Sequence, residues 1–335
     1  MKCIRCQNDC KYKERSNQRC PNCNGRFAFE PRTGDWTTDM QFQHAIEHVS
    51  SQGHLQWGVE HLYYELCRRQ RWGPVGKFLV GLFADTRLAR RTEENFNTMW
   101  KRWVDAHGKP AGVITRKNPL ERKSPRLEED IAHYSFDRVV ICDRARTVDI
   151  LLANNFHFEN NCAILSHDGY PPGPFNTIRK MLLRNPRLQV FVLHDATPDG
   201  CQLATRLARD PEWFAGKIPV VDVGLRPGQA TPLEGLFRRS QKRQVEPGEG
   251  LSVEEAKWLC RYRLELAAIR PEQILKRMFR ALNRQYDPNE STKDGMVDRT
   301  PATDSSGDGG WFVISDSTSF GSDASDSGDG GDSFG

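Results

Sequence analysis

The sequence predicts a multidomain α/β protein made of an N-terminal zinc ribbon, a helical basic domain, a parallel α/β domain and a disordered acidic tail. Three observations predict this order. Paired cysteines stand near the start, apolar residues at helical spacing follow, and short apolar runs then alternate with helical segments. The expected boundaries are residues 1–35, 36–127, 128–285 and 286–335.

Four cysteines near the start form two CxxC pairs, Cys3 with Cys6 and Cys20 with Cys23. Each pair lets two thiolates from one tight turn reach the same tetrahedral ion, so the spacing predicts a structural zinc site. A closed shell of four thiolates supports the fold and performs no chemistry. Cys10 is expected to be a bystander. Cations flank the cysteines and would let the ribbon contact nucleic acid or an acidic partner: Lys11, Lys13, Arg15, Arg19 and Arg26.

A helical pattern begins at Asp39, continues to a glycine-containing break, and resumes in a second helix, as in a helix-turn-helix. The apolar positions of the first helix are Phe42, Ala45, Ile46 and Val49. In the second helix the spacing predicts a core-facing side and a more exposed side. Leu62, Leu66 and Tyr63 are expected on the first, and Tyr64, Arg68 and Arg71 on the second.

The charge distribution is uneven. The net charge is +4, but the residues from Thr300 onward include seven aspartates and no lysine or arginine, so the rest of the chain carries +11. Residues 59–127 contain 15 Lys and Arg against 7 Asp and Glu, an excess of +8. Such a region is typical of proteins that bind a phosphate backbone, and its candidate nucleic-acid contacts are Arg68, Arg69, Arg71, Lys101 and Arg102.

Beyond a polar linker at residues 116–130 the pattern changes. "FDRVVICD", "NCAILS", "LQVFVLHD" and "KIPVVDVGL" are buried-strand candidates, and the segments at 147–156, 175–185 and 200–209 have helical spacing. This alternation predicts a parallel sheet with crossover helices. Residues 250–283 are expected to form a closing helical pair, with Ser252 as a cap.

Acidic residues follow two of the predicted strands, where α/β sheets place their chemistry. Asp143, Asp195 and Asp199 are either metal ligands or ordinary turn and cap residues. In the second case, Asp199 caps the helix that begins at Gly200. His167 and His194 also end strands. Each is either a metal ligand or satisfied by a backbone hydrogen bond.

Several segments together resemble the A subunit of topoisomerase VI and its relatives, the meiotic double-strand-break endonucleases. That family places a winged helix with a nucleophilic tyrosine ahead of a metal-binding Toprim domain. The similar segments span about residues 39–285 and occur in the family's order: "LYYEL", "RVVICDRA", "SHDGYPPGPFNTIRKML", "HDATPDG" and "VDVGLRPGQ". Within the third of these segments, Gly169, Tyr170, Pro171, Thr177 and Arg179 match the family pattern.

The resemblance implies a winged-helix-like domain at 36–127 and a Toprim-like domain at 128–285. It implies Tyr64 as the nucleophile, with Tyr63 as a second candidate, and Arg179 as a nucleic-acid contact. Asp143, Asp195 and Asp199 become weak ligands for magnesium, which prefers several oxygen ligands. Three departures predict a degenerate cleavage site: Asp143 replaces a glutamate, Thr197 replaces an aspartate, and Glu60 replaces an arginine.

Three functions follow. The first is a DNA-binding protein of the topoisomerase VI A type with a degenerate metal and cleavage site. The second is an active magnesium-dependent DNA transesterase or endonuclease that uses Tyr64, and the third is a zinc-ribbon scaffold for protein interactions. The resemblance also implies two candidate partners, a second copy of the chain in a homodimer and an ATPase. The acidic tail is either a solubilising segment or one that mimics nucleic acid or docks on a partner.

No apolar stretch approaches the roughly 20 residues of a membrane-spanning helix, and the first residues lack the apolar segment of a signal peptide. We therefore expect a cytoplasmic protein without a membrane partner, near the nucleoid if the source is bacterial.

Overall fold

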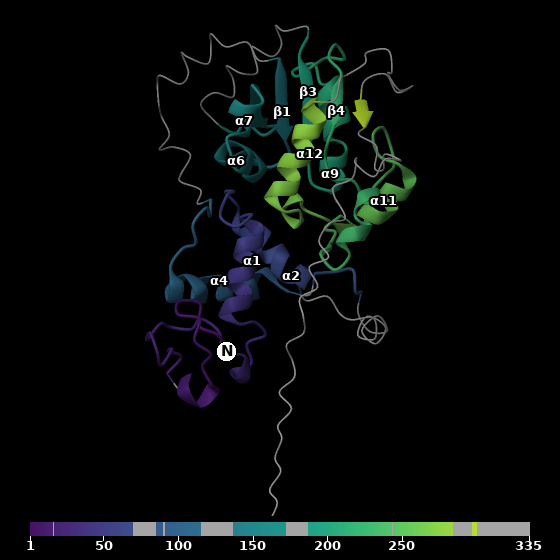
Figure 1. The fold of residues 1–335 in the computed structure, drawn as a ribbon. Helices are drawn as coiled ribbons and strands as arrows, with labels where there is room; N and C mark the ends of the chain where they lie inside the picture. The colour runs from purple at the N-terminus through teal and green to yellow at the C-terminus, as the bar shows by residue number, and fades with distance from the viewer. Residues whose placement is uncertain are drawn as a thin grey trace, which may run out of the picture.

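The computed structural model describes residues 1–15, 17–69, 85–89, 91–114, 137–171, 187–242, 244–283 and 297–299. The N-terminal segment contains two short 3-10 helices, η1 (Tyr12–Arg15) and η2 (Pro31–Thr33), and no regular strand in its described part. Figure 1 shows helices α1, α2 and α4 between this segment and the sheet.

Three helices form the middle of the molecule: α1 (Asp39–Val49), α2 (Val59–Arg69) and α4 (Glu93–His107). Thr38 begins α1 through a capping box with Gln41, which satisfies two backbone N–H groups at the helix start. The predicted helix pair with a break is confirmed. The helix-turn-helix and winged-helix assignments stay predictions, because two helices and a turn are common to many folds.

The α/β part is built on a parallel sheet with the order β2-β1-β3-β4-β7. The predicted parallel sheet and all four of its predicted strands are confirmed. The strands are β1 (Arg138–Cys142), β2 (Cys162–Ser166), β3 (Gln189–Leu193), β4 (Val220–Asp222) and β7 (Val297–Arg299). The connecting helices are α6 (Ala145–Ala153), α7 (Phe156–Glu159), α9 (Pro198–Cys201) and α10 (Leu203–Arg209).

Alternate strand residues enter two separate hydrophobic clusters, because successive side chains of a strand point to opposite faces. Val139 and Ile141 pack in a cluster with the side chains of α10. Val140 and Cys142 belong to a larger cluster that contains buried residues of α6, of the last closing helix, α12 (Pro271–Asn283), and of α1, α2 and α4. The middle helices and this face of the sheet therefore share one core.

The last part of the fold contains shorter elements around the carboxyl edge of the sheet. They are η4 (Pro227–Gln229), η5 (Thr231–Leu233), β5 (Arg238–Arg239), α11 (Val253–Leu259), β6 (Tyr262–Arg263), η6 (Leu266–Ala268) and α12 (Pro271–Asn283), with β5 antiparallel to β6. The predicted closing helices are α11, which Ser252 caps with Glu255, and α12.

The predicted helix at 175–185, the linker and nearly all of the acidic tail lie outside the described residues, as do Arg71, Thr177 and Arg179. Within the described ranges, no helix is long and apolar enough to cross a bilayer.

Candidate functional site

The two CxxC pairs lie on two turns of the same geometry. In the first, the N–H of Gln7 donates to the carbonyl of Cys3, and in the second the N–H of Asn24 donates to the carbonyl of Cys20. Gln7 and Asn24 both adopt the left-handed conformation, with φ 59° and 57°. The segments at 2–9 and 19–26 are thus two copies of one turn.

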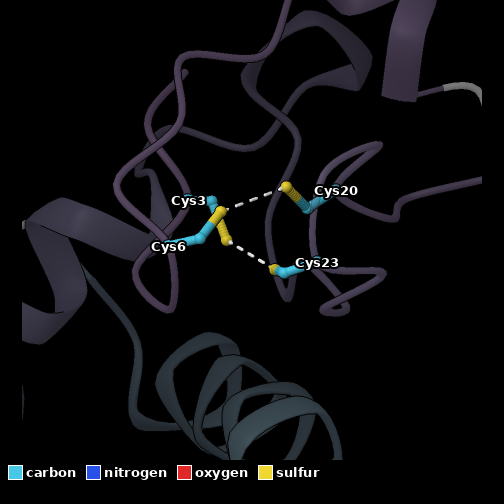
Figure 2. Close-up of side chains that lie close together, drawn as sticks. All are labelled: Cys3, Cys6, Cys20 and Cys23. Atoms are coloured by element: carbon cyan, nitrogen blue, oxygen red, sulfur yellow. Dashed lines mark hydrogen bonds between the residues drawn. The ribbon is translucent and has the colours of Figure 1, made fainter.

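The four sulfur atoms converge on one point between these turns, as Figure 2 shows. Cys3 Sγ lies 3.6 Å from Cys23 Sγ, and Cys6 Sγ lies 3.6 Å from Cys20 Sγ. A tetrahedron with Zn–S distances of about 2.3 Å has sulfur atoms about 3.8 Å apart, whereas a disulfide needs about 2.0 Å. The residues therefore fit a four-thiolate metal centre, compatible with structural zinc.

At two of the four cysteines, Cys6 and Cys20, backbone hydrogen bonds lower the pKa and so favour the thiolate form that a metal needs. At Cys23, against a backbone hydrogen bond from Gly25, burial and the neighbouring thiols raise the pKa. The backbone N–H groups of Cys23 and Asn22 lower the pKa of Cys20 to about 6. Cys10 is different. Its sulfur lies 3.6 Å from that of Cys20, but it is fully buried, and burial raises its pKa to about 11. Cys10 is thus a close neighbour of the centre with the character of a thiol.

Most of the cations that flank the cysteines are on the surface of this N-terminal segment. The exposed ones that take part in no salt bridge with another described residue are Lys2, Arg5, Lys11, Lys13, Arg19 and Arg26. Arg15, predicted as a surface contact, is an exception. Its guanidinium is buried against the Glu30 carboxylate, with an Nη2–Oε2 distance of 2.9 Å, and this ion pair lies within the N-terminal 35 residues.

Arg68 and Arg69, predicted nucleic-acid contacts, are engaged within the protein. Glu65 is buried in α2, and its carboxylate lies 2.9 Å from Arg68 Nη1, 3.6 Å from Arg69 Nε and 3.1 Å from Arg270 Nε. These three arginines lower the pKa of Glu65 against the opposing effect of burial. This cluster fastens α2 to the residues that precede α12.

Arg102 is engaged in a similar way, because its guanidinium forms a two-pronged ion pair with Asp35 at 2.7 Å. Lys101, the next residue before it, is exposed.

The carboxyl edge of the sheet gathers two of the predicted acidic residues on adjacent strands. Asp143 follows β1 and Asp195 follows β3, and the backbone N–H of Asp195 donates to Asp143 Oδ2 at 2.8 Å. The other Asp143 oxygen is buried with no hydrogen-bond partner among the described residues. Burial, followed by the charge of Asp195, raises the pKa of Asp143 to about 8. This carboxyl group therefore holds a proton near neutral pH.

Donors of the protein occupy both oxygens of Asp195. The N–H of Leu266 donates to Oδ1 at 2.7 Å, and Arg144 Nε lies 3.3 Å from Oδ2. Asp199 is not brought to this place, since its carboxylate is exposed and pairs with Lys242. In the described residues, only the four cysteines bring three or more metal-ligand atoms together. Magnesium binding by the three aspartates stays a prediction.

Asp199 does not cap the helix after β3. The cap is Thr197, whose hydroxyl accepts from the N–H of Gly200, and Asp199 lies in the first turn of α9. The predicted cap was therefore wrong. The helix begins at Pro198, two residues earlier than expected, because proline favours the first helical position, and the cap falls on Thr197.

His194 forms a buried ion pair at the same edge. Its Nε2 lies 2.9 Å from Asp222 Oδ1, and its Nδ1 lies 2.8 Å from the carbonyl of Asp195. With an acceptor at each ring nitrogen, the doubly protonated ring is favoured. His194 has a raised pKa despite its burial because of Asp222, and His194 is the largest influence that lowers the pKa of Asp222, to about 2. Gly224 has no side chain because a Cβ there would overlap the His194 ring.

Tyr64 is buried, with 1% of its surface exposed, so its predicted place on the open side of α2 was wrong. Its hydroxyl has no hydrogen-bond partner among the described residues. Burial and then the charge of Glu265 raise the pKa of Tyr64 well above its ordinary value, against the effect of Arg238. The Arg238 guanidinium lies 5.5 Å from the centre of the Tyr64 ring. Tyr63, by contrast, donates to the carbonyl of Arg91 at 2.7 Å.

Of one set of charged residues around Tyr64, sequence reasoning named only Glu60 and missed the others. Arg238 pairs with Glu93 at 2.7 Å and with Glu265 at 3.8 Å, and Arg146 pairs with Glu60 at 3.4 Å and with Glu265 at 3.9 Å. Arg146 stands three residues after Asp143 in the chain, which is the one local signal that could have indicated it.

No protein-family model, curated protein or solved structure matches the chain. The likeness to the topoisomerase VI A subunit therefore rests on the sequence segments alone.

Proposed function

We propose that the chain is a DNA-binding protein of the topoisomerase VI A type, with a zinc ribbon, a winged-helix-like domain and a Toprim-like domain whose cleavage site is degenerate. The observation that carries the proposal is charge. The residues before Thr300 carry +11, with an excess of +8 in residues 59–127. Positive regions of this size supply the non-specific part of DNA affinity.

The exposed cations of the ribbon support DNA contact at that end of the chain. Arg68, Arg69 and Arg102 contribute less, because each already pairs with a carboxylate of the protein. The ribbon and Lys101 are therefore the described surface on which we place the phosphate contacts.

The carboxyl edge supports a degenerate cleavage site. Magnesium prefers several oxygen ligands in near-octahedral geometry. Asp195 already accepts from Leu266 and faces Arg144, and Asp143 has a raised pKa that favours its protonated form. Donors of the protein thus compete with the ion for both oxygens of Asp195, which leaves one buried oxygen of Asp143 without a partner among the described residues.

A second candidate, an active strand-cleaving enzyme, is favoured by the Tyr64 hydroxyl, which lacks a hydrogen-bond partner and lies beside Arg238. In this reaction the phenol oxygen attacks a phosphodiester, a phosphotyrosyl bond forms and the bond from phosphorus to the leaving DNA oxygen breaks. The reaction requires the buried Tyr64 to become accessible and to lose its proton. Because the folded protein meets neither requirement, we rank the DNA-binding protein ahead of the strand-cleaving enzyme.

The test of DNA binding is the affinity of the full chain for duplex DNA over a range of salt concentrations. We expect a steep loss of affinity as salt rises, since each phosphate contact adds about 0.9 to the slope of log K against log salt. Lys11→Glu with Lys13→Glu should reduce that slope by about 2. The control is Lys217→Glu with Arg206→Glu, two exposed cations that lie outside the ribbon and outside residues 59–127. Absence of duplex binding at low salt would refute the proposal, and the zinc-ribbon scaffold for protein interactions would be the remaining hypothesis.

The test of cleavage is a search for DNA covalently attached to protein after incubation with supercoiled plasmid and magnesium or manganese. An adduct that is absent with Tyr64→Phe would establish the second candidate. Salt-sensitive binding without an adduct supports the first.

A further inference from the structure

A surface cavity of about 470 Å³ lies apart from the Tyr64 side chain and from the four cysteines. Its lining comes from the segment at 85–89, from α11 and from the start of β6: Arg87, Lys257, Trp258, Cys260, Arg261 and Tyr262. Cations and aromatic rings thus supply five of the six lining side chains. None of the proposed metal ligands takes part in it.

The three cations of this cavity are open to a ligand. Arg87, Lys257 and Arg261 are exposed, and no carboxylate among the described residues forms a salt bridge with any of them. This sets them apart from Arg68 and Arg102, which are paired with carboxylates of the protein. Three cations around one cavity, none of them with a carboxylate partner among the described residues, favour an anionic ligand.

The aromatic side of the cavity is held in place by a cluster of rings. Trp258 is half-buried, and its ring centre lies 5.6 Å from that of Tyr262 and 5.1 Å from that of Phe237. Tyr262 is buried and its hydroxyl donates to the Asp85 carboxylate at 2.5 Å, which fixes the ring. Trp258 is therefore a supported surface on which a flat ligand group can stack.

The segment that carries Arg87 is fastened to the same cluster. The backbone N–H of Phe237 donates to the carbonyl of Arg87 at 3.0 Å, and the N–H of Ala89 donates to the carbonyl of Phe237 at 2.7 Å. The Arg87 guanidinium lies 5.8 Å from the centre of the Tyr262 ring. The cation and the rings are thus positioned by one another before any ligand arrives.

We infer that this cavity binds one nucleotide, with the base stacked on Trp258 and the phosphate held by Arg87, Lys257 and Arg261. Aromatic surfaces flanked by cations are the general means by which proteins hold unpaired nucleotides. The volume is within the range of small-ligand sites. The inference rests on the proposed function, which makes the nucleotide part of an unpaired DNA strand. A free mononucleotide offers the same chemistry.

The cavity is connected to the Tyr64 region through β5. Phe237, whose ring packs on Trp258 and Tyr262, directly precedes Arg238, whose guanidinium lies beside the Tyr64 ring. β5 also pairs with β6, which begins at Tyr262. An unpaired nucleotide in the cavity would therefore hold the DNA strand at the edge of the predicted cleavage region.

The test measures binding of a labelled oligo(dT) strand, a labelled duplex and thymidine monophosphate to the full chain. Lys257→Glu with Arg261→Glu should lower the affinity for oligo(dT) about tenfold or more, because two of the three phosphate contacts are replaced by repelling carboxylates. Trp258→Leu should lower it similarly with no change in charge. Duplex affinity should fall by less than about threefold in both variants. The control for charge is again Lys217→Glu with Arg206→Glu, and circular dichroism verifies folding.

The outcomes separate the two proposals. Equal losses of oligo(dT) affinity in the cavity variant and the control variant would overturn the inference. An unchanged oligo(dT) affinity in all variants would overturn it as well. In both cases, salt-sensitive duplex binding would still support the proposed function. Binding of thymidine monophosphate that the cavity variants abolish, without binding of either DNA, would support the cavity with a free nucleotide as ligand and refute the proposed function. Binding of none of the three ligands would overturn both.

Discussion

Replacing Cys23 by serine removes one thiolate from the four-cysteine centre. We expect Cys23→Ser to lose the metal and to unfold residues 1–26, while α1, α2 and the sheet stay folded. The reason is that this part of the chain has almost no core of its own. Its buried apolar cluster consists of Cys3, Cys10, Cys20 and Phe27.

The magnitude follows from that composition. Full burial of one phenylalanine contributes about 1.5–3 kcal/mol, whereas a structural zinc contributes about 10–16 kcal/mol of apparent binding free energy at neutral pH. The metal therefore outweighs the apolar contacts several-fold, and residues 1–26 are expected to be folded only in the metal-bound form. The remainder of the chain has its own large core and keeps its stability.

The assay is zinc content per chain after gel filtration, together with hydrogen exchange of residues 1–26 and 39–69. Cys10→Ser is the matched control, because its sulfur is equally close to Cys20 but buried as a thiol. We expect one zinc in this control and none in Cys23→Ser. A Cys23→Ser variant that retains zinc and exchange protection, or a Cys10→Ser variant that loses both, would refute the assignment of the ligands.

Three further predictions concern the two tyrosines of α2, the His194–Asp222 pair and Asp143. Tyr64→Phe should raise the free energy of unfolding by about 1 kcal/mol because it removes an unpartnered buried hydroxyl, while Tyr63→Phe should lower it by about 1 kcal/mol, as urea titrations would measure. Asp222→Asn should destabilise the chain by about 3–5 kcal/mol, because it leaves the buried His194 cation unpaired. The stability that this ion pair provides should be lost as the pH falls from 3.8 through about 2, since the pKa of Asp222 is lowered, and again as the pH rises above 6.5, since that of His194 is raised. Asp143 has a raised pKa, so its folded state holds a proton that the unfolded state releases, and stability should fall as the pH rises from about 4 to 8. Thermal melts of Asp143→Asn across that interval should show a smaller fall, and an equal fall would contradict the reasoning.

The sequence was informative wherever the signal is local. The CxxC spacing identified the four cysteines, and the apolar runs that end in Cys142 and Leu193 identified two central strands. A buried parallel strand needs only a short continuous apolar segment, which a single sequence displays directly.

Sequence reasoning failed where a partner lies far away in the chain. Helical periodicity placed Tyr64 on an open side of α2, but η6 and the large shared core cover that side as well. Arg68 was interpreted as a nucleic-acid contact, yet its guanidinium donates to the carbonyl of Ala268, 200 residues later. Periodicity describes one element and carries no information about which other elements surround it.

The shared core also determines how Tyr64 could be reached. Swinging α2 away from the sheet would bring Leu62 and Leu66 into water, at about 1.5–3 kcal/mol for each side chain. β5 has two residues, and displacing it would break the Arg238 ion pairs and only a short ladder. Displacing β5 would also disturb Phe237, which is buried directly before it and packs on Trp258 and Tyr262. The cation over the Tyr64 ring and the aromatic support of the nucleotide cavity are thus consecutive residues of one segment, so a change at either one is transmitted to the other through a single peptide bond.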